Sequence, residues 1–103
     1  METFVLNKTG LLEGLKGHSQ EIRSYGVKSV GLFGSFVRNT ATERSDIDLL
    51  VEFEPRQKTY DNFMELSFFL ENLFGRKIEI VTPQSLNKYI GPHILNEVEN
   101  VSL

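Results

Sequence analysis

Residues 45–53 read SDIDLLVEF, a stretch in which apolar and polar side chains alternate except at Leu50. Successive side chains of a β-strand point to opposite faces, so this pattern predicts a strand with one wholly apolar face. That face carries Ile47, Leu49, Val51 and Phe53. Asp46 and Asp48 project side by side from the other face, where two carboxylates repel each other unless a cation lies between them. The stretch therefore predicts a core strand that presents two metal-ligating aspartates.

A second segment lies just upstream, at residues 30–35, and reads VGLFGS. It predicts a buried strand that ends at Gly34, where the backbone can approach a ligand closely and offer N–H groups to phosphate oxygens. Ser35 could donate its hydroxyl to phosphate or cap a short helix over residues 35–39. Arg38 lies about one helical turn further on, where its guanidinium could reach a phosphate or remain solvated.

An Asp-x-Asp pair alone is as often a solvent-exposed strand end as a metal site. Its combination with Gly34-Ser35 favours the metal site, and the outline is that of metal-dependent phosphoryl transfer. Hard carboxylate oxygens suit Mg²⁺, which takes its remaining ligands from water and substrate phosphates.

A third carboxylate comes from residues 77–81, KIEIV, a later strand on which Glu79 points away from the apolar side chains. If this strand lies beside the Asp46/Asp48 strand, Glu79 joins the two aspartates. The alternative is an exposed glutamate paired with Lys77 or with the preceding arginine. Three carboxylates on adjoining strands fit two-metal nucleotidyl transfer, in which cations hold the attacking and leaving oxygens.

The remaining segments predict helices that support the site. Apolar spacing predicts a helix over residues 8–25 and another over residues 60–74, the latter followed by Gly75. Thr82-Pro83 opens a short helix, Gly91-Pro92 interrupts it, and an apolar stripe follows at the C-terminus. Together these elements predict one small α/β (α+β) domain over residues 1–103, with a mixed sheet, helices packed on its apolar face and the carboxylates open on the other side.

Composition narrows the class of protein. The chain has 103 residues, a net charge of −3 and no cysteine, which excludes disulfides and thiolate zinc sites. His18 and His93 have no metal-ligand spacing. There is no long basic run, so we expect no autonomous nucleic-acid binding. No run is long enough to span a membrane, and residues 1–8 lack a signal-type pattern, so we expect a cytoplasmic protein without membrane association.

The combined motif resembles that of the minimal nucleotidyltransferases, a family within the DNA polymerase β-like nucleotidyltransferase superfamily. The resemblance covers most of the chain, including residues 77–82 and 92–98. It implies that Gly34 and Ser35, with Arg38, bind the triphosphate. It also implies that Asp46 and Asp48 bind catalytic Mg²⁺, and that Glu79 completes the metal site or activates the acceptor.

The resemblance further implies a partner. Many such proteins are antitoxins of helical HEPN-type ribonuclease toxins, and some inactivate the toxin by transferring AMP to a tyrosine. The expected function is therefore transfer of NMP, most plausibly AMP from ATP, to an acceptor hydroxyl with two Mg²⁺ ions. Two positions depart from the family pattern, because Asn39 stands where glycine is common and Glu79 where aspartate is common.

Two alternatives remain open. The chain could be a catalytically weak or inactive antitoxin that neutralises its partner by occlusion, which survival of neutralisation without Asp46 and Asp48 would indicate. It could also be an acidic metal-binding domain without nucleotide chemistry. The sequence leaves open whether the chain forms homo- or hetero-oligomers.

Overall fold

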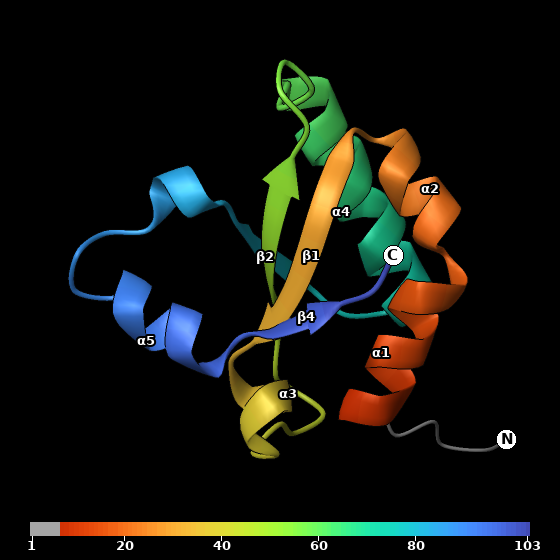
Figure 1. Cartoon of the computed structure of the whole chain (residues 1–103). Helices are drawn as coiled ribbons and strands as arrows, with labels where there is room; N and C mark the ends of the chain where they lie inside the picture. Colours follow the sequence, from red (N-terminus) through yellow and green to blue (C-terminus); the bar gives the residue numbers. More distant parts are fainter. Residues whose placement is uncertain (1–6) are drawn as a thin grey trace, which may run out of the picture.

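The computed structural model describes residues 7–103, which form a mixed four-stranded β-sheet with helices on both sides (Figure 1). The strand order is β3-β2-β1-β4. Strand β1 pairs antiparallel with β2 and with β4, whereas β2 and β3 are parallel. The strands are β1 (Val27–Phe33), β2 (Ile47–Phe53), β3 (Ile78–Val81) and β4 (Glu99–Val101). The predicted α/β class with a mixed sheet is confirmed.

One face of the sheet packs against α1 (Lys8–Gly17), α2 (Ser19–Ser24) and α4 (Tyr60–Phe74) (Figure 1). The alternation predicted for β2 is observed, with every second residue buried from Ile47 to Phe53. The fully buried side chains of this core come from both layers: Leu11, Leu15, Ile22, Leu32, Ile47, Leu49, Val51, Leu66 and Leu70. The apolar face of the sheet is therefore fully covered by helices.

The single helix predicted over residues 8–25 is wrong, because the chain breaks at His18 into α1 and α2. His18 has non-helical backbone angles, with φ −115° and ψ 25°, and its ring Nδ1 lies 2.9 Å from the carbonyl oxygen of Gly14. The break changes the direction of the chain, so that residues of both short helices reach the core. Leu15 before the break and Ile22 after it are both fully buried.

Helix α4 has the predicted bounds, and its ends show why. The Thr59 hydroxyl accepts a hydrogen bond from the Asn62 N–H at the start, and Gly75 ends the helix in the left-handed conformation. Helix α4 connects β2 to β3, and a crossover of this kind is what a parallel strand pair requires. In the resulting register Asp48 lies directly opposite Glu79.

The C-terminal part of the chain differs from the prediction. Gly91-Pro92 does not interrupt a helix but begins one, α5 (Gly91–Glu97), because proline is tolerated in the first helical turn. The short 3₁₀ helix η1 (Pro83–Ser85) precedes it. Both lie on the opposite side of the sheet from α1, α2 and α4 (Figure 1). The predicted C-terminal stripe is divided, since Ile94 is buried on α5 whereas Val101 belongs to β4, which the sequence analysis missed.

The helices that the structure describes all lie within residues 7–103. None of the helices in this range combines the length and the apolar character that a bilayer span requires. Residues 1–6, on which the prediction of a missing signal segment mainly depended, lie outside the described residues.

Candidate active site

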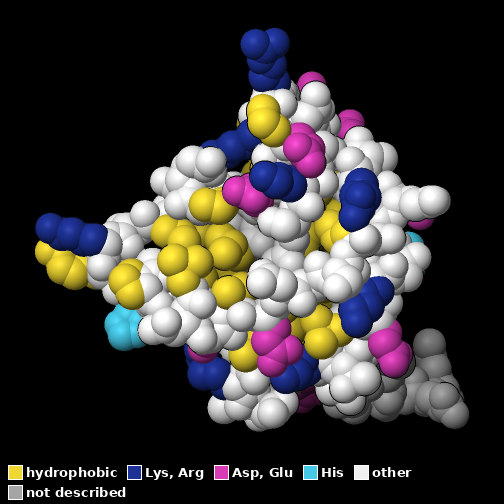
Figure 2. Space-filling model, in the orientation of Figure 1, with side chains coloured by type: hydrophobic (Ala, Val, Ile, Leu, Met, Phe, Trp, Pro, Cys, Tyr) yellow, Lys and Arg dark blue, Asp and Glu magenta, His cyan; other side chains and the backbone are white. Residues whose placement is uncertain are grey.

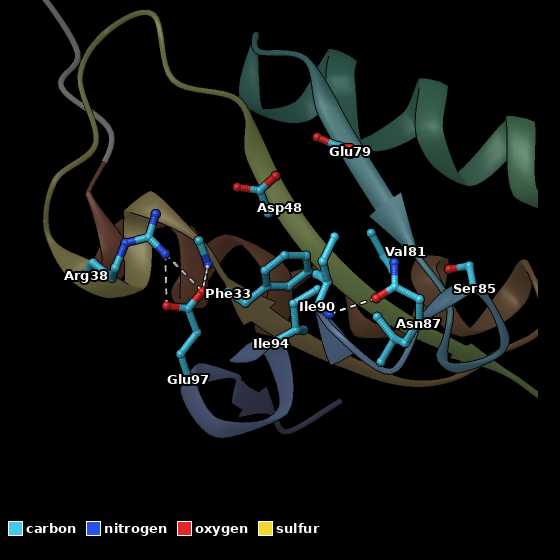
Figure 3. Close-up of a pocket in the computed structure, with 12 residues that line it drawn as sticks. Phe33, Arg38, Asp48, Glu79, Val81, Ser85, Asn87, Ile90, Ile94 and Glu97 are labelled. Carbon is cyan, nitrogen blue, oxygen red and sulfur yellow. Dashed lines mark hydrogen bonds and ion pairs between the residues drawn. The ribbon is translucent and has the colours of Figure 1, made fainter. Parts of the chain in front are cut away.

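Two predicted acidic residues meet on the face of the sheet opposite α4. Asp48 on β2 lies opposite Glu79 on β3, and Figure 3 shows both side chains on neighbouring strands at the same pocket. Asp46, which the sequence placed on the strand, lies one residue before β2 begins. Its negative charge still acts on Asp48. The structure therefore brings Asp48 and Glu79 together, with Asp46 at the entrance to the same strand.

The electrostatics at Asp48 are those of a site that attracts cations. Partial burial, followed by the negative charges of Glu79 and Asp46, raises the pKa of Asp48 from 3.8 to about 6. The Arg38 guanidinium acts in the opposite direction and lowers this pKa. A bound cation would remove the repulsion between the carboxylates and favour the ionised form of Asp48.

The carboxylates open into a pocket of about 460 Å³, a volume typical of small-molecule sites. Figure 2 shows the hollow between α5 and η1, where apolar side chains gather. The apolar part of the lining consists of Phe33, Val81, Leu86, Ile90 and Ile94. The pocket thus has an acidic side on β2 and β3 and an apolar wall made largely by the segment that the sequence analysis had not assigned to the site.

The turn after β1 has the predicted form. Gly34 adopts φ 82° and ψ −152°, and helix α3 (Ser35–Arg38) follows it directly. Asn39 ends α3 in the left-handed conformation, with φ 60° and ψ 31°, which asparagine adopts more readily than most residues. The replacement of the family's common glycine by Asn39 therefore leaves the turn intact. Gly34 and Arg38 line the pocket, whereas Ser35 is half-buried beside it and is not part of the lining.

An unpredicted residue, Glu97 at the end of α5, binds the groups that the sequence assigned to phosphate. Its carboxylate accepts a hydrogen bond of 2.9 Å from the Gly34 N–H and lies 2.9 and 3.1 Å from Nη1 of Arg38 (Figure 3). Glu97 follows Gly34 by 63 residues. No local spacing in the sequence indicates such a contact.

Arg76, the arginine that precedes Lys77, has other partners than Glu79. Its Nη1 donates hydrogen bonds to the carbonyl oxygens of Thr42, at 2.8 Å, and Ser45, at 2.9 Å. The guanidinium also lies over the Phe36 ring, 5.3 Å from its centroid. Within residues 7–103, Glu79 forms no ion pair with Arg76 or Lys77. Arg76 therefore holds the loop that delivers Asp46 and Asp48 to β2.

We expect Arg76→Lys to lower the transfer rate about 10- to 100-fold, the usual effect of losing a residue that orients metal ligands. Lysine keeps the charge but lacks the planar fork that reaches two carbonyls and stacks on Phe36. The measurement is the initial transfer rate against Mg²⁺ concentration. Lys77→Ala, an exposed change one residue away, is the control. An unchanged Mg²⁺ dependence in Arg76→Lys would show that the loop needs no such support.

The candidate metal ligands are the carboxylates of Asp46, Asp48 and Glu79. In the described part of the chain, no three His, Cys, Asp or Glu side chains converge tightly enough to form a complete metal centre. Asp48 and Glu79 nevertheless lie together, and the pKa of Asp48 is raised first by burial and then by the negative charges of Glu79 and Asp46. Mg²⁺ commonly takes only one or two protein carboxylates and completes its shell with water and phosphate oxygens. The residues present fit such an ion.

Comparisons with known proteins give a matching family and similar relatives. The profile of the nucleotidyltransferase domain family matches residues 15–101. The chain is 41% identical over 85 residues to the protein adenylyltransferase MntA of Thermococcus cleftensis, covering 82% of this chain and 85% of the relative.

Two solved structures are similar in fold. One, described as a minimal nucleotidyltransferase, has a TM-score of 0.69 and 34% identity, covering 85% of this chain and 93% of its own. A toxin–antitoxin crystal structure with AMP-PNP has a TM-score of 0.62 and 21% identity, covering 94% of this chain and 73% of its own. At that identity the second likeness concerns the fold alone.

Proposed function

This chain belongs to the nucleotidyltransferase domain family, and from this premise we propose a specific reaction. The chain transfers AMP from ATP, with Mg²⁺, to a hydroxyl group of a helical HEPN-type toxin and so acts as a cytoplasmic antitoxin. The observation that carries the proposal is the pairing of Asp48 with Glu79 at the pocket that Gly34 and Arg38 also line. A nucleotidyltransferase needs acidic metal ligands and phosphate-binding groups at one pocket.

The proposed roles apply what the family resemblance implies to the side chains of this chain. Asp46 and Asp48 would hold Mg²⁺, with Glu79 as the third acid, and two ions would complete the site. The metal would neutralise charge on the phosphates and favour attack at the α-phosphorus. The Gly34 N–H and the Arg38 guanidinium would bind the β- and γ-phosphates, with Ser35 beside them. The apolar wall of the pocket offers a surface for the base and ribose.

The transfer itself needs one acceptor and one leaving group. The acceptor hydroxyl oxygen would bond to the α-phosphorus while the bond to the pyrophosphate oxygen breaks. Glu79 lies on the exposed side of the pocket, where an acceptor from another protein can reach it. It is therefore the carboxylate best placed to take the hydroxyl proton.

The choice of acceptor has support from the relatives. The T. cleftensis relative, 41% identical, is named as a protein adenylyltransferase, which supports an acceptor on a protein. A chain of 103 residues leaves little surface for a substrate channel of its own, so the partner would supply much of the acceptor site.

Occlusion without transfer is a second candidate, and one observation favours it. Ile90 and Leu95 of the α5 region are 55% and 59% exposed, which gives the pocket side of the molecule an apolar surface of the kind that protein partners cover. In this case neutralisation of the toxin would survive loss of the aspartates.

The experiment incubates this chain with the adjacent-gene toxin, ATP and Mg²⁺, and measures the intact mass of the toxin. We expect the mass to increase by one or more AMP units with the wild type and not with Asp46→Asn/Asp48→Asn. A stable complex with unchanged toxin mass would contradict transfer and favour occlusion. Equal modification by the double variant would contradict the metal assignment.

A further inference from the structure

The Glu97 carboxylate is bound to the groups that, in the proposed function, bind the phosphates of the substrate. It is the last residue of α5, and its side chain is 25% exposed. Oε2 accepts the Gly34 N–H, and both oxygens lie within 3.1 Å of Nη1 of Arg38. A carboxylate held by one backbone amide and one guanidinium has the same partners that a phosphate group would have.

We propose that Glu97 competes with the nucleotide triphosphate for the Gly34 N–H and Arg38, so that binding requires Glu97 to leave. This inference rests on the proposed function, because it takes Gly34 and Arg38 as the phosphate-binding groups. The Gly34 N–H is a single donor and cannot bond well to both anions. A retained Glu97 would also place a negative charge against the triphosphate.

The fold allows Glu97 to leave without displacing α5. Ile94, one turn earlier, is buried in the pocket wall, and Val101 pairs with Val30 just after the helix. These two anchors hold α5 from both sides of Glu97. The Arg38 side chain is 56% exposed and can turn toward a ligand or toward water. The contact is therefore suited to exchange one anion for another.

In the substrate-free protein, Glu97 occupies the groups that are proposed to bind phosphate. With its carboxylate in place, the Gly34 N–H is paired and the Arg38 charge is partly neutralised. A protein whose binding-competent state is only partly populated binds its ligand with an affinity reduced by that fraction. Glu97 would thus lower the affinity for every triphosphate while leaving contacts with the base unchanged.

The test compares Glu97→Gln and Glu97→Ala with the wild type by calorimetry in the presence of Mg²⁺. The probes are ATP, inorganic tripolyphosphate and adenosine, which separate phosphate binding from base binding. We expect the Kd for ATP and for tripolyphosphate to fall about five- to tenfold in Glu97→Ala, and less in Glu97→Gln, which keeps an acceptor atom. The affinity for adenosine should not change.

Glu99→Gln is the matched control, because it removes the same charge two residues away. Glu99 pairs with Lys8 at 2.7 Å and does not line the pocket. It should leave all three affinities unchanged, whereas an equal gain in Glu99→Gln would show that net charge alone is responsible. Circular dichroism of each variant verifies the fold.

The outcomes separate this inference from the proposed function. If the Glu97 variants bind tripolyphosphate no more tightly than the wild type, or more weakly, Glu97 positions the donors and competition is overturned. If the Glu97 variants bind tripolyphosphate more tightly than the wild type does, competition by Glu97 is supported. If ATP then binds no more tightly than tripolyphosphate, the result counts against ATP as the substrate. Absence of binding for every phosphate probe in every variant would overturn both.

Discussion

Asp48→Asn is expected to reduce AMP transfer by more than about a hundredfold. The loss of a residue that only orients a metal ligand already costs about 10- to 100-fold, and Asp48 is proposed as a ligand itself. Asparagine keeps the size of the side chain but has no negative charge to hold Mg²⁺. The measurement is the rate of toxin modification followed by intact mass.

Asp61→Asn is the charge-matched control for this substitution. Asp61 lies in the first turn of α4 and is not part of the pocket lining, so its replacement should leave transfer unchanged. Near-normal transfer by Asp48→Asn at saturating ATP would contradict the metal assignment.

Asp48→Asn is also expected to be more stable than the wild type in the absence of metal. The pKa of Asp48 is about 6 in the folded protein and 3.8 ordinarily. Between these values the folded state binds more protons than the unfolded state, so the contribution of Asp48 to stability falls as pH rises through this interval. The stability advantage of Asp48→Asn should therefore be small near pH 4 and reach its full size above pH 6. Urea unfolding of both proteins with EDTA measures it, and an advantage that shrinks as pH rises would refute the interpretation.

Gly34→Ala is expected to abolish transfer and to lower the free energy of unfolding by about 3 kcal/mol. The φ of 82° and ψ of −152° at this position belong to a region essentially reserved for glycine. A Cβ added to Gly34 would also overlap the Asp48 carboxylate. Backbone strain at residue 34 and overlap between the new Cβ and the Asp48 carboxylate therefore both destabilise the variant. A shift that relieves either of them moves Asp48 or the N–H of residue 34 from its position. Urea unfolding and the toxin modification assay give the two readouts.

Gly75→Ala separates the two causes. Gly75 also has a positive φ, 65°, but a Cβ added there meets no atom within 4 Å. It should cost about 1 kcal/mol through backbone strain and leave transfer unchanged. If Gly34→Ala were no worse than Gly75→Ala in either measurement, close contact between the turn and Asp48 would not matter for the site.

The sequence predicted secondary structure best where an element buries one face only and where neighbouring residues determine its ends. Strand β2 was predicted from alternation because Ile47, Leu49, Val51 and Phe53 all face one helical layer. Helix α4 was predicted to the residue because Thr59 and Gly75 mark its ends with side-chain and backbone chemistry. The break at His18 and the three-residue strand β4 were missed, since both are determined by tertiary packing and leave no periodic pattern.

For the site, the sequence identified the family, which the comparisons confirm. Of the six residues it named, Gly34, Arg38, Asp48 and Glu79 line one pocket, whereas Ser35 and Asp46 do not. The roles of Asp46, Asp48 and Glu79 as metal ligands remain predictions. Glu97 and Arg76 could not be found in this way, because the contacts of Glu97 span 59 and 63 residues and those of Arg76 span 31 and 34. Contacts at such separations depend on strand register and helix docking.

The two walls of the pocket are made at different times during synthesis. Residues 34, 48 and 79 leave the ribosome before residues 90–97, and α5 is held partly by the pairing of Val101 with Val30. A nascent chain that has released only its first 81 residues can pair β1, β2 and β3 but exposes Phe33 and Val81 to the surroundings. Transient exposure of apolar surface favours aggregation or capture by chaperones. Nucleotide or toxin would therefore meet a complete pocket only after translation has passed residue 101.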